Sequence, residues 1–200
     1  MGFVGGYAAV VLAGGAGRRL AGADKPSLTV GAVSMLDRVL AAVADAHPRV
    51  VVGPSPLAAA LPDGAVLTTE DPPGSGPVAA TAAGLRLVPP VVPYVALLAA
   101  DLPFLTSAAI RMLAAEMVAP GRDAGLRASA DAGVDAPDGA AGLASLSGTA
   151  VRDAAGSLVD GALFVDSDGR RQLLCGLWRV DALRAALAAL GDPRNDLLLK

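Results

Sequence analysis

Four short apolar stretches occur in the first half of the chain. Each is largely apolar at successive positions rather than at alternate ones, which is typical of parallel strands that are buried on both faces of a sheet. We therefore expect buried parallel strands at Tyr7–Leu12, Arg49–Val52, Ala65–Thr68 and Tyr94–Ala99.

Helical patterns lie between and after these strands. Apolar residues fall on one side of Ser34–Ala44, a second pattern at Val78–Leu87 opens after Gly76-Pro77, and a third spans Ser107–Met117. Strands that alternate with helices predict an α/β fold, with a three-layer, open, mostly parallel sheet covered on both faces. In such sheets ligands bind beyond the carboxyl ends of the strands, so the chemistry is expected in the loops at that edge.

The composition changes in the second half of the chain. Residues 121–161 are rich in alanine, glycine, aspartate and serine, contain no aromatic residue and show little apolar periodicity. This composition favours a long flexible insertion within a single domain of residues 1–200 over a second domain. After the insertion we expect a β-hairpin with strands at Ala162–Asp166 and Leu173–Trp178, and a last helix at Asp181–Leu190.

Composition and charge narrow the classes of function. With 54% hydrophobic and 18% charged residues, a chain of 200 residues can bury one sizeable core. The formal net charge of −3 and the dispersed basic residues argue against nucleic-acid binding and against attachment to a membrane surface. No apolar run is long enough to span a membrane, and no positive charge precedes Tyr7–Leu12 as in a signal sequence. We therefore expect a cytoplasmic protein.

Neither the cysteine nor the histidine predicts covalent or metal chemistry. Cys175 has no second cysteine to pair with and lies among leucines, which indicates a small buried apolar residue. His47 has no cysteine or histidine near it at metal-ligand spacing, so we expect it on the surface.

The first strand leads directly into a glycine-rich segment, residues 13–19, which ends in two arginines. Glycine lets backbone N–H groups approach an anion, and guanidinium groups can bind phosphate. The dinucleotide-binding motif fails because Leu20 stands in place of its last glycine, and the P-loop fails because Ala23 follows Gly22. Taken alone, the glycines could equally well join a strand to a helix. The presence of Lys25 within one loop's reach makes the pattern more specific.

Two aspartates follow predicted strands at the same edge of the sheet. Asp101 comes directly after the apolar strand Tyr94–Ala99, and Mg²⁺ prefers one or two carboxylate oxygens together with phosphates. We therefore expect Asp101 to bind Mg²⁺, the alternative being a turn or helix-capping aspartate. Asp71 stands in the segment 70–74, where an ordinary solvated turn explains it as well as a functional role does.

The glycine-rich segment and the two aspartates belong to a longer pattern, which covers roughly residues 7–117. It comprises residues 12–20 (Leu-Ala-Gly-Gly-Ala-Gly-Arg-Arg-Leu), Asp24-Lys25, residues 36–40, Asp71 with Gly76-Pro77, residues 83–85 and residues 100–105, and it returns at residues 170–179. This pattern resembles that of the molybdenum cofactor guanylyltransferases, which are MobA-like NTP transferases. The resemblance implies the Rossmann-like fold of the nucleotide-diphospho-sugar transferases.

The resemblance also implies roles for the matched residues. Leu12, Ala13 and Gly14 would contact the guanine nucleotide, as would Gly53, although an asparagine often stands at that position in the family. Asp71 would contact the nucleoside. The expected nucleotide-binding residues are Leu12, Ala13, Gly14, Gly15, Gly17, Lys25, Gly53, Asp71 and Asp101, and the expected catalytic residues are Arg18, Arg19, Lys25 and Asp101.

The activity that the resemblance implies is the transfer of GMP from GTP to molybdopterin, with release of pyrophosphate. The attacking phosphate of molybdopterin is already ionised, so no protein base is required. With Mg²⁺ on Asp101 and with cationic side chains around the triphosphate, catalysis reduces to alignment and neutralisation of charge. The same context implies contacts with other proteins of molybdenum cofactor biosynthesis.

Two other functions fit parts of the pattern. A cytidylyltransferase or sugar-1-phosphate nucleotidyltransferase would use the same loop, lysine and aspartate, although such sequences more often read Leu-Ala-Ala-Gly at residues 12–15. A nucleotide-binding regulatory module without turnover is the alternative from another class. It is kept open by the insertion at 121–161, near the acceptor region, and by an end at Lys200 that indicates a shortened carboxyl terminus.

Overall fold

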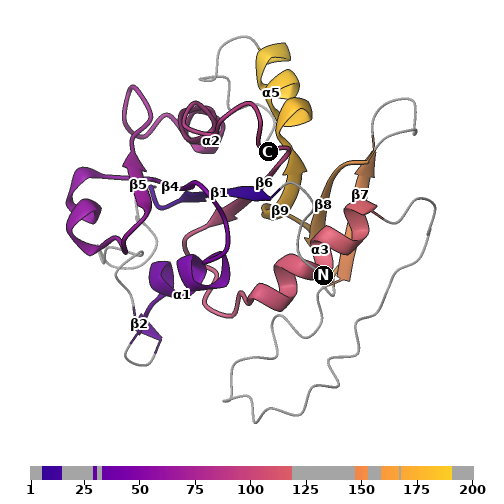
Figure 1. Cartoon of the computed structure of the whole chain (residues 1–200), viewed down its shortest axis with the longest axis horizontal. Helices are drawn as coiled ribbons and strands as arrows, with labels where there is room; N and C mark the ends of the chain where they lie inside the picture. Colours follow the sequence, from indigo (N-terminus) through magenta and orange to yellow (C-terminus); the bar gives the residue numbers. More distant parts are fainter. Residues whose placement is uncertain are drawn as a thin grey trace.

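The computed structural model describes residues 6–14, 29–30, 33–118, 147–152, 159–166 and 168–190. Its main feature is a seven-stranded sheet with the strand order β5-β4-β1-β6-β9-β8-β7 (Figure 1). A separate pair of two-residue strands is formed by β2 (Thr29–Val30) and β3 (Val33–Ser34). The strands of the main sheet are β1 (Tyr7–Leu12), β4 (Arg49–Val52), β5 (Ala65–Thr68), β6 (Tyr94–Ala99), β7 (Ser147–Arg152), β8 (Val159–Val165) and β9 (Arg171–Arg179).

Strands β5, β4, β1 and β6 are parallel, and β1 lies between β4 and β6. Tyr7 is opposite Tyr94 and Leu12 is opposite Ala99, so β1 and β6 begin and end together. Every residue of β1 is buried, because helices cover both faces of the sheet around it. The predicted strands of the first half are all confirmed, with the bounds expected from the sequence.

The strand direction reverses after β6. Strand β9 is antiparallel to β6, β8 is antiparallel to β9, and β7 is antiparallel to β8, which confirms the predicted hairpin. We expected a flexible insertion at 121–161. That expectation is wrong for residues 147–152, which form β7, and for residues 159–161, which start β8. Small side chains such as those of Ser147, Gly148 and Ala150 give no apolar run, yet their backbone can still pair with a neighbouring strand. Residues 121–146 and 153–158 lie outside the described residues.

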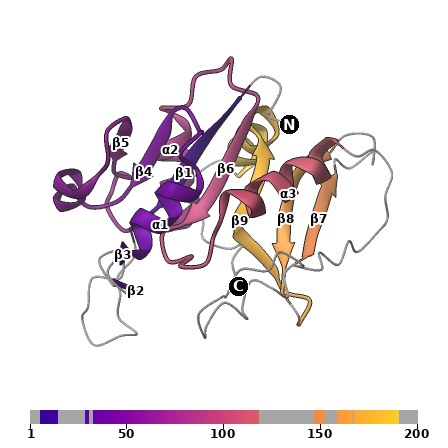
Figure 2. The same ribbon diagram turned by 60° about the horizontal axis from the view of Figure 1, so that its bottom comes forward.

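Helices cover both faces of the sheet and make it a three-layer structure. Helices α1 (Met35–Ala42) and α3 (Ser107–Val118) lie on one face, and α2 (Pro77–Leu85) and α5 (Val180–Ala189) lie on the other (Figures 1 and 2). These confirm the predicted helices to within two residues at each end. Ser34 caps α1, because its Oγ accepts a hydrogen bond of 3.0 Å from the backbone N–H of Asp37. A short 3-10 helix, η2 (Ser55–Ala60), joins β4 to β5.

Alternate residues of β1 contribute to the two halves of the core. Ala9 and Val11 pack in the cluster that includes α1 and α3, and Val10 packs in the cluster that includes α2. Helix α2 approaches the sheet closely at Gly84, where an added Cβ would lie only 2.4 Å from Cγ1 of Val10. Because Gly84 has no side chain, the backbone of the helix packs directly against the side chain of Val10. Helix α2 begins at Pro77, in the connection that leads from β5 to β6.

Cys175 and His47 lie where the sequence predicts them. Cys175 is buried in β9 with 2% of its surface exposed, and His47 is exposed at the end of the loop that precedes β4. Within the part of the chain that the structure describes, no group of three or more histidine, cysteine or acidic residues could hold a metal ion. None of the described helices is both long and apolar enough to span a membrane.

Candidate active site

The carboxyl ends of the parallel strands meet at one edge of the sheet, which we call the carboxyl edge. Loops leave it after β1, β4, β5 and β6, and most of the sequence-predicted site residues are in these loops. The described ones are Leu12 at the end of β1, Ala13 and Gly14 after it, Gly53 after β4, Asp71 after β5 and Asp101 after β6.

Backbone hydrogen bonds hold the first residues of three of these loops. The N–H of Ala13 donates to the carbonyl of Val52 at 2.8 Å, and the N–H of Gly53 donates to the carbonyl of Thr68 at 2.9 Å. The N–H of Ala100 donates to the carbonyl of Leu12 at 3.0 Å. These bonds extend the sheet pairing one step beyond the strands, so the loops start from fixed positions.

Gly14 and Gly53 lie close together at this edge. A Cβ added to Gly14 would lie 4.0 Å from Cα of Gly53 and 3.9 Å from the carbonyl oxygen of Val52, which is ordinary contact distance. A Cβ added to Gly53 would instead lie 2.9 Å from Cδ1 of Leu57 and 3.3 Å from Cβ of Ala13. The crowding at residue 53 explains why this chain has glycine there, and it limits any nucleotide contact at this position to the backbone.

Asp101 is exposed at the carboxyl edge, two residues after the end of β6. The bond between Ala100 and Leu12 places it beside the loop that begins at Ala13. One carboxylate at this position fits Mg²⁺, which is commonly held by one or two protein carboxylates together with phosphate oxygens. Asp101 would hold Mg²⁺ in this way, and the ion would contribute positive charge against the phosphates.

Asp71 is exposed as well, but it lies on the other side of β1 from Asp101. The strands that lead to these two aspartates, β5 and β6, are three strand spacings apart, which corresponds to about 14 Å. The structure therefore does not bring the two carboxylates together into one metal site.

Glu70 is a buried carboxylate at the carboxyl edge that the sequence did not lead us to expect. It precedes Asp71, yet only 7% of its surface is exposed, and its Oε1 accepts a hydrogen bond of 2.9 Å from the N–H of Gly74. The same oxygen would lie 3.8 Å from a Cβ added to Gly14. The turn-forming residues of the segment 70–74 suggested a solvated turn. The position of Glu70, two residues after the end of β5, was the feature of the sequence that could have indicated a place at the carboxyl edge.

The other predicted site residues lie outside the described part of the chain. They are Gly15, Gly17, Arg18, Arg19 and Lys25, and their roles stay predictions.

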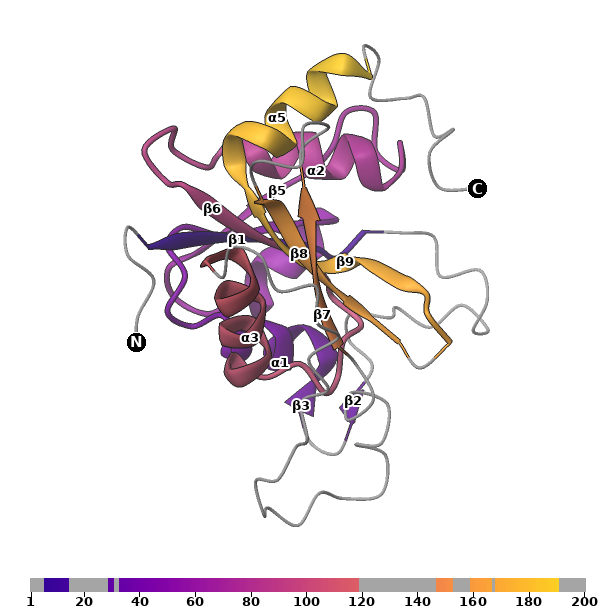
Figure 3. The same ribbon diagram turned by 90° about the vertical axis from the view of Figure 1, so that its right-hand side faces the viewer.

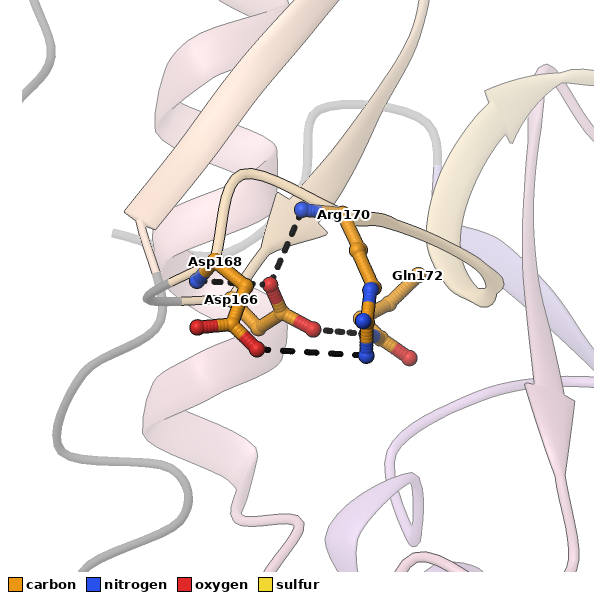
Figure 4. Close-up of polar contacts among 4 residues, drawn as sticks. All are labelled: Asp166, Asp168, Arg170 and Gln172. Carbon is orange, nitrogen blue, oxygen red and sulfur yellow. Dashed lines mark hydrogen bonds and ion pairs between the residues drawn. The ribbon is translucent and has the colours of Figure 1, made fainter.

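The hairpin between β8 and β9 also reaches the carboxyl edge. Because β9 is antiparallel to β6 and Cys175 pairs with Leu98, the first residues of β9 extend past the end of β6 (Figure 3). Asp166 holds the turn: its Oδ1 accepts from the N–H groups of Asp168 and Arg170, and its Oδ2 accepts from Nε2 of Gln172 (Figure 4). A firm turn with exposed arginines at Arg170 and Arg171 therefore flanks the site.

The structure thus combines a mostly parallel sheet that has helices on both faces with loops that carry the described candidate site residues at the carboxyl edge. The chain belongs to the MobA-like NTP transferase domain family, whose family model matches residues 9–200. No curated protein matches the chain significantly.

Two solved nucleotidyltransferases share the fold along most of the chain. A 4-diphosphocytidyl-2C-methyl-D-erythritol synthase from Anaerococcus prevotii has a TM-score of 0.52 and 12% identity, over 92% of this chain and 76% of that one. A 2-C-methyl-D-erythritol 4-phosphate cytidylyltransferase from Thermus thermophilus has a TM-score of 0.51 and 20% identity, over 91% of this chain and 74% of that one. At these identities the similarity shows the Rossmann-like nucleotidyltransferase fold.

Two mycobacterial proteins are also similar. Rv0371c from Mycobacterium tuberculosis H37Rv is 24% identical, with a TM-score of 0.46 over 53% of this chain. A homologue of it from Mycobacterium sp. strain JC1 is 27% identical, with a TM-score of 0.46 over 60% of this chain. The matched part of the chain spans 57% and 61% of the length of these two proteins.

Proposed function

We propose that this protein transfers GMP from GTP to molybdopterin and releases pyrophosphate, forming the guanine dinucleotide form of the cofactor. The observation that carries the proposal is the position of Asp101 beside the loop that starts at Ala13, in a chain of the MobA-like family. The proposal includes a cytoplasmic location and contacts with other proteins of molybdenum cofactor biosynthesis, as the family resemblance implies.

In the proposed reaction a terminal phosphate oxygen of molybdopterin attacks the α-phosphorus of GTP. The new bond joins that oxygen to the α-phosphorus, the bond from the α-phosphorus to the oxygen that bridges to the β-phosphate breaks, and pyrophosphate leaves. The attacking oxygen carries no proton to remove, so the chain needs no general base. Its residues align the two phosphates and neutralise charge, a preorganised electrostatic effect.

The described residues along the carboxyl edge would have different roles in this reaction. Leu12 and Ala13 are held by backbone hydrogen bonds to Ala100 and Val52, so the backbone at the end of β1 would hold the nucleotide in one position. Asp101 lies on the β6 side, where it would hold Mg²⁺ against the triphosphate. The predicted cations Arg18, Arg19 and Lys25 would add charge on the same phosphates.

Calorimetric titration with GTP, CTP, ATP and UTP in the presence of Mg²⁺ tests the proposal. We expect selective binding of GTP, which Asp101→Ala and Lys25→Ala both weaken, and pyrophosphate release once molybdopterin is added. Asp63→Asn is the matched control, because it removes an exposed acid from the loop that precedes β5, at the opposite edge of the sheet.

The remaining outcomes separate the alternatives. Preferential binding of CTP or another triphosphate would assign the chain to a different nucleotidyltransferase activity. Selective GTP binding without pyrophosphate release in the presence of molybdopterin would favour a regulatory nucleotide-binding module. Absence of binding to any of the triphosphates would refute the proposal.

A further inference from the structure

Glu70 is an unusual side chain in this fold. It and Thr81 are the buried polar or charged residues among those that the structure describes. The hydroxyl of Thr81 donates to the carbonyl of Pro77 within α2, so it is satisfied locally. Glu70 accepts one hydrogen bond, from Gly74, and no lysine, arginine or histidine of the described residues forms an ion pair with it. Since a carboxylate can accept about four hydrogen bonds, most of its accepting capacity is left over.

The second oxygen, Oε2, is not among the buried side-chain atoms of the described residues that lack a hydrogen-bond partner, so it is reached by solvent and is open to a ligand. The neighbours are informative: Oε1 of Glu70 lies at contact distance from the position that a side chain on Gly14 would occupy. Gly14 is exposed and belongs to the loop predicted to hold the nucleotide. The carboxylate thus borders the space above this glycine.

The position of Asp101 indicates which part of a nucleotide would occupy that space. Asp101 follows β6, whereas Glu70 follows β5, and β1 with Gly14 lies between them. If Mg²⁺ and the phosphates are on the Asp101 side, the nucleoside extends from Gly14 toward β4 and β5. On that stretch Gly14 presents no side chain and a Cβ added to it would meet no atom closer than 3.8 Å, whereas the Cβ position of Gly53 is filled by Leu57 and Ala13, so a base would approach the backbone at Gly14, beside Glu70.

An ionised carboxylate only accepts hydrogen bonds, and guanine is the base whose pairing edge presents two adjacent donors, the N1–H and the N2 amino group. Cytosine and adenine place an acceptor nitrogen beside their amino group on that edge, which faces a carboxylate unfavourably. We propose that Glu70 is a specificity-determining residue that selects guanine by accepting hydrogen bonds from N1 and N2 of the base. This inference rests on the proposed function, because it names the group that reads the base in the same site.

The hydrogen bond from Gly74 supports this role. It fixes Oε1 against the turn that leads toward α2, which leaves Oε2 and the second lone pair of Oε1 for a ligand. In addition, Thr69 donates from Oγ1 to the carbonyl of Gly53 at 2.8 Å, so the residue before Glu70 is tied to β4. The carboxylate is therefore held in place before any ligand arrives, as a selective site requires.

The test compares GTP with XTP, whose base has a carbonyl oxygen where guanine has the N2 amino group. Calorimetry in Mg²⁺ is performed on the wild type, on Glu70→Gln and on the control Asp63→Asn. Glutamine keeps the shape of the side chain but replaces one acceptor with a donor. We expect the wild type and the control to prefer GTP, and Glu70→Gln to shift the GTP-to-XTP affinity ratio toward XTP by about tenfold or more, the size of one good base contact.

A second variant covers the case in which Glu70→Gln does not fold, as judged by circular dichroism. Gly14→Ala adds a methyl group beside the carboxylate at an ordinary contact distance, so we expect it to fold and to lower the preference for GTP. If Glu70→Gln weakens GTP and XTP equally, or Gly14→Ala leaves the ratio unchanged, the inference is overturned while the proposed function stands. A wild type with no preference for GTP overturns both.

Discussion

The backbone N–H of Ala100 donates a hydrogen bond of 3.0 Å to the carbonyl of Leu12. The last residue of β1 is thereby joined to the residue that precedes Asp101. The predicted metal ligand, Asp101, and the start of the predicted nucleotide loop, at Ala13, are consequently held next to each other by this hydrogen bond. Substitutions of exposed side chains at this point should change chemistry without changing the fold.

Asp101→Asn tests whether chemistry can be changed here without a change in the fold. It removes the charge of the proposed Mg²⁺ ligand but keeps the size of the side chain, and Asp101 is exposed, so the stability of the fold should change little. We expect pyrophosphate release from GTP and molybdopterin to fall by about 10²-fold or more, as for the loss of other preorganised electrostatic groups. Asp63→Asn should retain the wild-type rate. Equal rates for Asp101→Asn and wild type would exclude Asp101 from catalysis.

Gly84→Ala should destabilise the protein through steric crowding between α2 and β1. The new methyl group would lie 2.4 Å from Cγ1 of Val10 and 3.1 Å from Cγ2 of Val52, and both valines are fully buried. Overpacking of this kind costs about 1–3 kcal/mol, which outweighs the gain of up to about 1 kcal/mol from the higher helix propensity of alanine. Urea unfolding measures the change in the free energy of unfolding.

A double-mutant cycle provides the control for Gly84→Ala. In a Val10→Ala background the contact with Cγ1 of Val10 is removed and that with Val52 at 3.1 Å stays, so the same substitution should cost less there. An equal cost in both backgrounds would mean that the contact with Val10 is not the cause.

Asp166→Ala should loosen the β8–β9 turn. The substitution removes three accepted hydrogen bonds, from the N–H groups of Asp168 and Arg170 and from Nε2 of Gln172. We expect the free energy of unfolding to fall by about 1–3 kcal/mol and amide hydrogen exchange at Asp168 and Arg170 to accelerate. Asp168→Ala is the matched comparison, because its 3.8 Å ion pair with Arg170 is exposed and should contribute at most about 1 kcal/mol. A larger effect for Asp168→Ala would contradict this assignment.

Cys175 should be protected from thiol reagents in the folded protein. Burial raises the pKa of its thiol from 9.0 to about 12. The neutral thiol is therefore favoured in the folded state. The free energy of unfolding includes this preference in full below pH 9 and loses it as the pH rises from 9 toward 12. Labelling with a disulfide reagent at about pH 8, below the ordinary thiol pKa, should be fast in denaturant and slow without it. Fast labelling of protein shown to be folded would contradict the burial of this residue.

The strands that could be predicted from the sequence are those in which burial requires an apolar residue at almost every position. Both faces of β1 and β4 are covered, so nearly every position must be apolar, and the bounds of these strands are visible in the sequence. Strand β7 is at the edge of the sheet, where pairing through the backbone makes no such demand on the side chains. Its serine, glycine and alanine residues therefore resemble those of a loop.

The candidate site, too, could be predicted from the sequence only in part. Asp101 could be placed because it follows a buried strand directly along the chain. The burial of Glu70 depends instead on the return of the chain at Gly74 and on the packing of β5 beside β4, which no local pattern contains. Contacts between loops from different strands arise only when the sheet is assembled.

The position of β1 in the sheet also affects how the chain is made. It is synthesised before both of its partner strands, which are Arg49–Val52 and Tyr94–Ala99. At about 5–20 residues per second, β6 follows roughly 4–17 s after β1. During that interval a fully apolar strand has an unpaired edge, so newly made chains are most open to self-association before β6 appears. Slower synthesis between these two strands should lower the yield of soluble protein.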